Sequence, residues 1–508
     1  MSGKKSSLFK KLHKWPGLII AFLLLYYAVS GIFMNHRELF SRFDVSRKPL
    51  PKEFQYTNWN NSALKSNLIV TSDSILVFGN VGIWVTDSTF VNYNSLNAGF
   101  PKGVDNRKIF DVHRSANGEL YAATQFGLFA FNQQSKKWQD LRLDVSIKRF
   151  VGIESVGDTI YALNRSFLFK GKSEGTLSHF EKIELAAPLG YKNEVSVFKT
   201  MWQIHSGEIV GLPGKLFVDL LGLVTLFLSL TGIIYFFFPK WMKRRKRKEK
   251  PISNLAKTNR WSLKWHNFTG AWLFVFLIVL FFTGMFLRPP LLIAIARLNT
   301  APIKYSHLDQ PNPWYDKLRD ILYDAESEEF LISTSDGMFR MGKNESKPIP
   351  FQIQPPVSVM GINVLEHYNN GAYLIGSFSG LYLWHPAHPE IYDFAKGQLY
   401  QGAPSGRPVG DYKVTGFLTG VAGEKYLVEY DRGAIPVAHQ HVFPEMPQQV
   451  LTESKMSLWN LSLEIHTGRF FRFLFGNFYI LLVPLSSLIA VMVVFSGYMV
   501  YRKKFKRK

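Results

Sequence analysis

The chain contains no cysteine among its 508 residues. This absence excludes disulfides, a thiolate nucleophile, Cys-ligated zinc, Cys-bound iron–sulfur clusters and thioether-attached haem. Charged residues are also scarce, at 19%, against roughly 25% in an ordinary soluble domain. Hydrophobic residues make up 47% of the chain and aromatic residues 15%. A metal or cofactor site must therefore be built from His, carboxylate, Tyr or Met side chains.

The positive charge of the chain is concentrated in three short blocks. The formal net charge is +22, and residues 1–14, 240–264 and 502–508 supply nearly all of it. Each block lies beside a long apolar run, which is the positive-inside pattern of membrane proteins. A nucleic-acid-binding protein would instead spread its basic side chains over a folded face, so we expect no nucleic-acid partner.

Four apolar segments are long enough to cross a hydrocarbon core of roughly 30 Å. They are Trp15–Met34, Leu216–Phe238, Ala271–Leu287 and Phe478–Tyr501. The basic blocks precede the first span, join the second to the third and follow the fourth, so both termini are expected in the cytoplasm. No small-residue cleavage site follows the first span, which we interpret as an uncleaved anchor. We therefore expect a multi-pass protein of the bacterial inner (cytoplasmic) membrane, with the lipid bilayer as a partner and two large periplasmic segments.

The two halves of the chain follow one plan: a span, a long outer segment and a second span. The first and third spans open with the pattern His-x-aromatic-x-Gly, at His13 and His266. The second and fourth spans are preceded by Ile-His-(Ser/Thr)-Gly, at His205 and His466. Each span also carries a small hydroxyl residue followed by glycine, at Ser30–Gly31, Thr231–Gly232, Thr283–Gly284 and Ser496–Gly497. Small residues such as Gly17, Gly31, Gly270 and Gly284 would let helices, or a flat cofactor, approach closely. Parallel repeats are related by an axis along the membrane normal.

This plan predicts a helical bundle of four spans with an all-β extracytoplasmic region. The predicted boundaries are 1–36 for the cytoplasmic N-terminus and first span, 37–204 for the first β-rich segment, 205–239 for the second span, 240–264 for the basic cytoplasmic loop, 265–288 for the third span, 289–465 for the second β-rich segment, and 466–508 for the fourth span and basic tail.

The outer segments are rich in Tyr, Thr, Val, Ile, Gly and Asn, which is typical of short strands joined by turns. A strand, a turn and a Gly-apolar-aromatic motif recur twice in each half, and a degenerate third copy follows in each half, at residues 161–169 and 426–433. The clean copies have their glycines at Gly82 and Gly127 in the first half and at Gly337 and Gly380 in the second. Their spacing matches a four-stranded blade and favours a six-bladed β-propeller formed from both halves. Two separate β-rich domains are the alternative.

The four repeat-matched histidines are the strongest chemical signal. A pseudo-twofold axis would place His13 opposite His266 and His205 opposite His466. Two neutral imidazoles on opposite sides of an axis are what a six-coordinate b-type haem requires, and helix bundles build cofactor sites from facing helices. The alternative is that these side chains are interfacial anchors. Because His205 lies well before its apolar run, His36 is a fallback ligand at the outer site.

The histidine motifs and the repeated plan resemble the PepSY-associated transmembrane family of bacterial inner membranes. Members of that family include iron-regulated membrane proteins and haem-containing ferric-siderophore reductases. The resemblance implies two b-type haems, ligated by His13, His266, His205 and His466. It covers the four spans, whereas the propeller-like outer segments differ from the PepSY modules that such proteins usually carry.

We therefore expect a di-haem b transmembrane electron-transfer protein, a membrane oxidoreductase of the ferric-chelate reductase type. Electrons would enter from a membrane quinol or a cytoplasmic reductase and leave to an extracytoplasmic acceptor such as a ferric siderophore. The cytoplasmic parts are short and contain no G-x-G-x-x-G motif, so a separate electron donor is needed.

The alternative function is a non-enzymatic membrane sensor or scaffold. Its propeller-like ectodomain would bind an extracytoplasmic protein, and the basic run at 243–248 would bind anionic lipid. A transporter is less well supported, because no broken span carries a mid-membrane charge.

Overall fold

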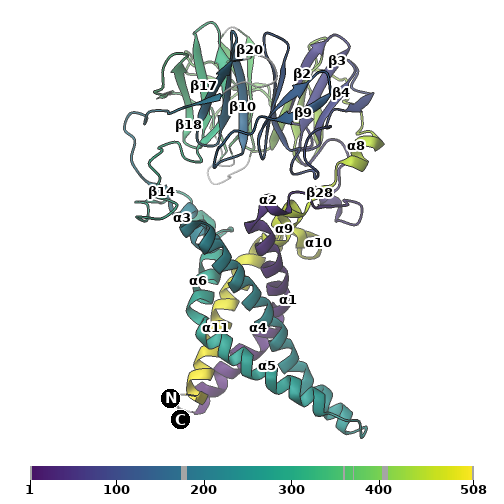
Figure 1. Ribbon diagram of the computed structural model, residues 1–508, viewed down its shortest axis with the longest axis vertical. Coiled ribbons are helices and arrows are strands. Elements are labelled where there is room, and N and C mark those ends of the chain that lie inside the picture. The colour runs from purple at the N-terminus through teal and green to yellow at the C-terminus, as the bar shows by residue number, and fades with distance from the viewer. Residues whose placement is uncertain (1–2, 173–179, 359–360, 370, 403–409, 506–508) are drawn as a thin grey trace. The chain divides into compact units, whose positions relative to one another are not determined.

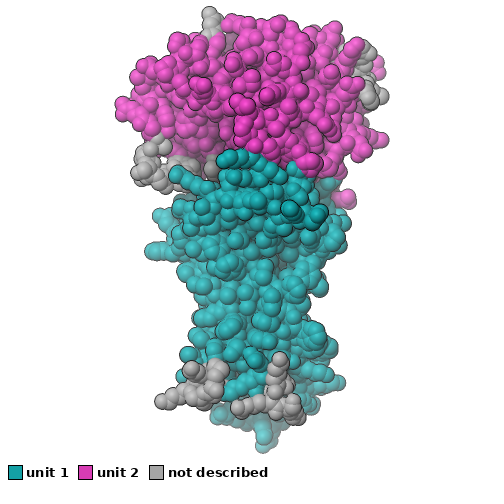
Figure 2. All heavy atoms as spheres, turned by 90° about the vertical axis from the view of Figure 1, so that its left-hand side faces the viewer, with its two compact units in different colours: residues 1–40, 192–310, 458–508 teal, residues 41–191, 311–457 magenta. Residues whose placement is uncertain are grey.

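The computed structural model describes residues 3–172, 180–358, 361–369, 371–402 and 410–505. The chain forms two compact units, coloured separately in Figure 2. Unit 1 comprises residues 1–40, 192–310 and 458–508, and unit 2 comprises residues 41–191 and 311–457. The last three residues of the predicted basic tail, 506–508, lie outside the described residues.

Unit 1 is helical, and Figure 1 shows its long helices crossing one another. The helices are α1 (Gly3–Asn35), α2 (Arg37–Phe40), α3 (Val197–Ser206), α4 (Gly211–Lys246), α5 (Ser253–Trp272), α6 (Phe274–Met285), α7 (Leu291–Ile295), α9 (Leu458–His466), α10 (Arg472–Phe475) and α11 (Leu482–Phe505). Helix α1 packs against α4 and α11, α11 packs against α6, and α4 packs against α5. Leu221, Val224 and Leu277 form a buried apolar core between α4 and α6.

Three helical segments of the described chain are long and apolar enough to span a membrane. They are Leu8–Asn35, Glu208–Lys246 and Arg469–Lys503. A fourth span is present if α5 and α6 are counted together, although these helices meet at an angle of 70°. Helix α6 alone has 12 residues, or about 18 Å at 1.5 Å per residue, so it cannot cross a bilayer without part of α5. The predicted third span is therefore not one straight helix.

Unit 2 is an all-β region of small antiparallel sheets. The three sheets from the first half are β2–β5 (Ser66–Thr71, Ser74–Gly79, Gly82–Thr86, Tyr93–Ser95), β6–β9 (Ile109–Arg114, Leu120–Thr124, Leu128–Asn132, Lys137–Asp140) and β10–β13 (Phe150–Val156, Thr159–Asn164, Leu168–Lys172, Phe180–Ile183). Those from the second half are β16–β19 (Leu318–Asp324, Glu329–Thr334, Gly337–Gly342, Ile349–Pro350), β20–β24 (Ile362–Asn369, Ala372–Ser377, Gly380–Trp384, Ile391–Asp393, Gln398–Leu399) and β25–β27 (Val414–Thr419, Lys425–Glu429, Gly433–Val437).

Short elements connect these larger ones. Strands β1 (Asp44–Val45) and β28 (Met456–Ser457) pair within unit 2, and β14 (Val195–Ser196) and β15 (Asn299–Thr300) pair within unit 1. The six-residue helix α8 (Gln448–Glu453) also belongs to unit 2.

The repeated motif of the outer segments falls on the same hairpin in all six sheets, between the second and third strands. Gly82, Gly337 and Gly380 begin a third strand with positive φ angles of 90°, 126° and 144°. A residue with a side chain would be strained in this conformation, which is why glycine recurs there.

The sheets of unit 2 pack side by side through their first strands. Strand β2 contacts β6, β6 contacts β10, β10 contacts β16, β16 contacts β20, and β20 contacts β25. Strand β25, from the last sheet, also contacts β2, from the first sheet. Buried aromatic and aliphatic side chains from neighbouring sheets form the core between them.

Candidate functional site

The structure brings the four repeat-matched histidines together as two pairs. His13 on α1 lies beside His266 on α5, with ring centroids 5.9 Å apart and an interplanar angle of 73°. His205 on α3 lies beside His466 on α9, with ring centroids 6.0 Å apart and an angle of 56°. Each pair joins one histidine from each half of the chain. We call them the inner pair and the outer pair, after their predicted depths in the membrane.

Every one of these rings is held through Nδ1 by a helix from the opposite half. The Nδ1 atoms of His13, His205 and His466 lie 2.9 Å from the carbonyl oxygens of Val493, Leu280 and Tyr27, respectively. The Nδ1 atom of His266 lies 3.0 Å from the hydroxyl of Thr231. Because Nδ1 donates in each carbonyl bond, the tautomer is fixed and Nε2 keeps a free lone pair. Among the described residues, Nε2 of these rings makes no hydrogen bond.

The Ser/Thr–Gly pairs of the spans supply the surface against which each ring packs. A Cβ atom on Gly284 would lie 2.7 Å from Cε1 of His205, and one on Gly497 would lie 2.7 Å from Cε1 of His13. The corresponding distances are 3.1 Å from Gly31 to His466 and 3.5 Å from Gly232 to His266. At three of the four positions a methyl group would therefore crowd the imidazole. Gly31 and Gly284 were expected from the sequence to be sites of close approach, but the ring that each one contacts was not predicted.

A reversal of the backbone explains how the outer pair forms although its histidines lie several residues before the apolar runs of the second and fourth spans. Helix α3 ends at Gly207, which is left-handed with φ of 77°, and α9 is followed by Gly468 with φ of 78°. A Cβ atom on Gly207 would lie 2.1 Å from the carbonyl oxygen of Gly214. The segment before each span is thus a separate short helix, which brings His205 and His466 alongside the outer ends of α6 and α1.

His36, the predicted fallback ligand, lies elsewhere in unit 1. Its Nε2 atom is 2.6 Å from a carboxylate oxygen of Asp219. The amide nitrogen of Asn35 donates to the other carboxylate oxygen at 3.0 Å. Asp219, an acidic residue near the start of the second span, therefore has both His36 and Asn35 as partners.

The ring spacing of each pair is close to the spacing that two imidazoles bound to one haem iron would have. Two metal–imidazole bonds of about 2 Å on opposite sides of one iron would place the ring centroids roughly 6.3 Å apart. The observed separations of 5.9 and 6.0 Å are close to this value. No group of three or more His, Cys, Asp or Glu side chains in the described residues could hold a metal ion. A pair suits a porphyrin, whose iron already has four nitrogen ligands, better than it suits a bare cation.

Buried polar atoms beside the pairs also fit a group that carries polar substituents. Ser262 lies one turn before His266 and is fully buried, and its hydroxyl has no partner among the described residues. The amide oxygen of Gln203, two residues before His205, is likewise buried and unpartnered within that part of the chain. Such atoms are costly unless something satisfies them.

A second cluster of ionisable side chains lies in unit 2, on or directly before the first strands of its sheets. Lys65 donates to a carboxylate oxygen of Asp320 at 3.4 Å, and Ser66 donates to Glu366 at 2.9 Å. Burial raises the pKa of Asp320 to about 6, although Lys65 opposes the shift. Burial also raises the pKa of Glu366 to about 7, with the nearby Asp320 and Asp111 adding to the effect. Sequence reasoning missed this cluster because its members come from different sheets.

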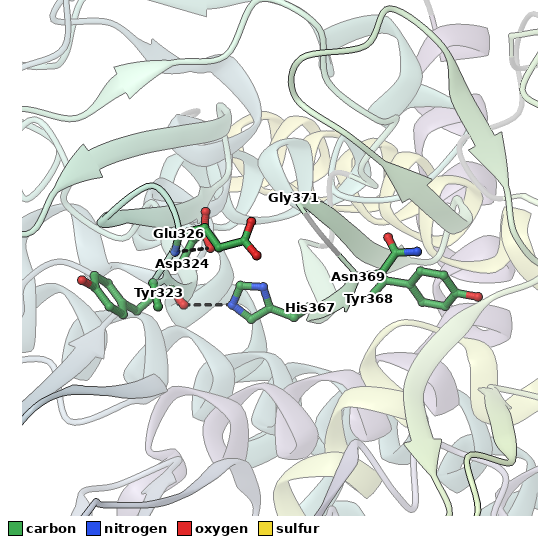
Figure 3. Close-up of a pocket in the computed structure, with 8 residues that line it drawn as sticks. Tyr323, Asp324, Glu326, His367, Tyr368, Asn369 and Gly371 are labelled. Carbon is green, nitrogen blue, oxygen red and sulfur yellow. Dashed lines mark hydrogen bonds between the residues drawn. The ribbon is translucent and has the colours of Figure 1, made fainter.

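Unit 2 also has a surface pocket, shown in Figure 3. It lies between β16 and β20, and its lining includes Tyr323, Asp324, Glu326 and His367. His367 Nε2 is 2.9 Å from the carbonyl oxygen of Tyr323, and Asp324 accepts a hydrogen bond from the backbone of Glu326. The polar side chains named here already have hydrogen-bond partners in the pocket wall. The pocket belongs to unit 2 and is not part of the histidine site of unit 1.

Comparison with protein families identifies the chain. The model of the PepSY-associated TM region matches twice, over residues 1–238 and 239–504. The chain therefore belongs to this family, and the two matches divide it into the halves that the repeat predicted. It is a multi-pass membrane protein in contact with the lipid bilayer. A comparison with curated proteins finds no match.

Solved structures resemble the chain only distantly. The extracellular domain of BT4673 from B. thetaiotaomicron is 11% identical with a TM-score of 0.33, and the alignment covers 76% of this chain and 40% of that one. The chain thus spans less than half the length of that protein. The computationally designed Ika8 protein is 9% identical (75% and 99% covered, TM-score 0.29). The N-terminal domain of Nup159 is 8% identical (78% and 92% covered, TM-score 0.30). Similarity at this level does not identify a shared function.

Proposed function

We propose that the protein is a di-haem b transmembrane electron-transfer protein. The observation that supports the proposal is the close approach of two imidazole pairs, His13 with His266 and His205 with His466, with ring centroids 5.9 and 6.0 Å apart. Bound haem iron would supply one-electron redox chemistry. The residues of this chain bind, orient and shield that group.

The Nδ1 contacts prepare each imidazole to bind iron. A ring that donates Nδ1–H to a carbonyl presents a neutral, basic Nε2, and this hydrogen bond fixes the orientation of the ring. Val493, Leu280 and Tyr27 serve this purpose for three rings, and the hydroxyl of Thr231 contacts the fourth. The apolar spans around the pairs exclude water from the sites.

The separation of the two pairs along α1 supports a transmembrane route. His13 belongs to the inner pair, while Gly31 packs against His466 of the outer pair. These residues are eighteen positions apart on one helix, or about 27 Å at 1.5 Å per residue. That length is close to the hydrocarbon thickness of roughly 30 Å. The two sites would therefore lie near opposite faces of the membrane.

The proposal also covers topology. We infer four spans, with the bent pair α5 and α6 counted as the third, cytoplasmic termini and an inner-membrane location, from the three basic blocks. We further propose that the six sheets of unit 2 form a six-bladed propeller, supported by the contacts between successive first strands and by the contact of β25 with β2.

The proposed reaction is reduction of an extracytoplasmic ferric chelate of the siderophore type, with electrons from a quinol or a cytoplasmic reductase. The test uses the purified full chain in lipid vesicles with a reductant trapped inside and ferric citrate plus ferrozine outside. The wild type should produce the ferrous ferrozine colour faster than protein-free vesicles and faster than a His205→Ala variant. Haem-loaded wild-type protein that gives only the protein-free rate would contradict the electron-transfer function.

A further inference from the structure

Two arginines lie immediately beyond the outer histidine pair. Arg288 follows Gly284, the glycine that packs on His205, by four residues. Arg469 follows His466 by three residues and begins the short 3₁₀ helix Arg469–Phe471 after α9. Both belong to unit 1, and both lie within electrostatic range of Glu464. The outer pair therefore has cationic side chains at its edge.

These side chains carry more positive charge than the protein neutralises. Glu464 is mostly buried, with its side chain 11% exposed, and accepts a hydrogen bond from Arg469 at 2.5 Å. One carboxylate thus serves two guanidinium groups. The Nε atoms of both Arg288 and Arg469 are buried and have no hydrogen-bond partner among the described residues. A buried guanidinium donor without an acceptor is costly, so the site fits an additional anionic oxygen ligand.

The corresponding positions in the first half of the chain are not cationic. Asn35 stands where the second half has Arg288, each 22 residues after the histidine of its span. Glu208 stands where the second half has Arg469, each three residues after its histidine. Asn35 donates to Asp219 at 3.0 Å, and Glu208 lies 3.6 Å from Lys215. The pseudo-twofold symmetry of the histidines is therefore broken by charge at these two matched positions.

We propose that Arg288 and Arg469 bind the carboxylate groups at the edge of the porphyrin held by His205 and His466. This inference rests on the proposed function. Arginine forms two parallel hydrogen bonds to a carboxylate, which provides both affinity and orientation. The porphyrin of the outer site is thereby oriented with its carboxylates toward the second-half side of the bundle. Lipid phosphate offers the same anionic chemistry, and the experiment separates the two.

The experiment measures how fast haem leaves the full-length protein for an excess of apomyoglobin. The protein is loaded either with ferric protoporphyrin IX or with its dimethyl ester, which lacks the carboxylates. The variants are Arg288→Gln, Arg469→Gln and Arg288→Lys. The matched control is Arg472→Gln, which removes an exposed arginine three residues from Arg469.

With protoporphyrin, one of the two haems should leave about tenfold faster from Arg288→Gln and Arg469→Gln than from the wild type, a change of about 1.4 kcal/mol. Arg288→Lys should recover part of the difference, and Arg472→Gln should match the wild type. With the dimethyl ester, the wild type should already release one haem quickly, and the glutamine variants should be no faster. The midpoint potential of one haem should fall in the glutamine variants, because a nearby positive charge stabilises the reduced form.

Equal acceleration with both porphyrins would overturn the inference, since the arginines would then act through the fold or through lipid phosphate. Release rates and potentials equal to those of Arg472→Gln would also overturn it. These outcomes leave the proposed function standing, because the wild type would still hold two haems. A wild type that holds no haem would instead reject the proposed function.

Discussion

The imidazole rings of His205 and His466 come from opposite halves of the chain and lie 6.0 Å apart between centroids. His205 is held by the carbonyl of Leu280, and His466 by the carbonyl of Tyr27. Each supporting carbonyl lies three residues before a Ser/Thr–Gly pair of the partner half. The duplication of the chain has therefore produced reciprocal support, in which each half positions the histidine of the other.

Replacing a single histidine should empty one site and spare the other. In His13→Ala, we expect the haem content to fall from two to one per chain, because one imidazole remains at the inner pair while the outer pair is intact. Pyridine haemochrome absorbance against protein concentration measures the ratio. His367→Ala, in unit 2, is the control and should retain two haems. Loss of both haems, or of neither, from folded His13→Ala protein would contradict the pairing.

The glycines that face the rings should differ in their tolerance of a methyl group. In Gly284→Ala, the new Cβ would meet His205 at 2.7 Å, so the ring must shift and the outer haem should bind at least tenfold more weakly. In Gly232→Ala, the distance to His266 is 3.5 Å, an ordinary contact, and haem binding should be nearly unchanged. Haem titration of the apo forms compares them. Similar affinities for both variants would show that the predicted packing does not control the site.

The buried carboxylates of unit 2 should make its stability fall as pH rises. Burial raises the pKa of the Glu366 carboxyl from its ordinary value of 4.5 to about 7, and that of Asp320 from 3.8 to about 6. A raised carboxyl pKa means that the folded state holds the proton more tightly, so stability declines between about pH 4 and pH 7 and is constant above. Glu366→Gln, which keeps the size of the side chain, should flatten part of this decline and raise the melting temperature at pH 8. A wild-type stability that increases over this range would contradict the prediction.

Lys65 should contribute more to the stability of unit 2 at high pH than at low pH. It is the cation that faces Asp320, and it also donates to the carbonyl oxygen of Phe110 at 2.6 Å. Lys65→Met leaves the carboxylates without this charge, which we expect to cost about 3 kcal/mol at pH 8. The cost should be smaller at pH 5, where more of the carboxyl groups are protonated. Urea unfolding followed by tryptophan fluorescence gives both values. Lys102→Met removes an exposed lysine and should have little effect at either pH; an equal loss from both variants would reject this role of Lys65.

Part of the site could be predicted because the chain is duplicated. A single histidine near a span has no assigned partner, but His13 and His266 occur at matched positions, so symmetry identifies them as a pair. The residues that contact each imidazole ring were only partly predictable from the sequence. The Ser/Thr–Gly pairs indicated close approach, whereas the contact of Gly31 with His466 depends on the backbone reversal at Gly468. That reversal is a property of the folded chain rather than of its hydropathy.

The strands of unit 2 could be predicted from the repeated hairpin, because positive φ angles require glycine at fixed points. The bend at Leu273 could not be predicted, since the sequence around it contains no proline. The carboxylate cluster was also unpredictable from local pattern. Asp111, Asp320 and Glu366 each look like an isolated polar residue within a strand, and only the packing of successive first strands brings them near Lys65.

The most direct test of the account is the optical spectrum of the purified full chain after expression with abundant haem. The account predicts the reduced-minus-oxidised bands of low-spin b-type haem at two haems per chain, with one haem lost in His13→Ala and the other in His466→Ala. A folded wild-type protein without these bands would contradict the central claim and would favour the sensor or scaffold function.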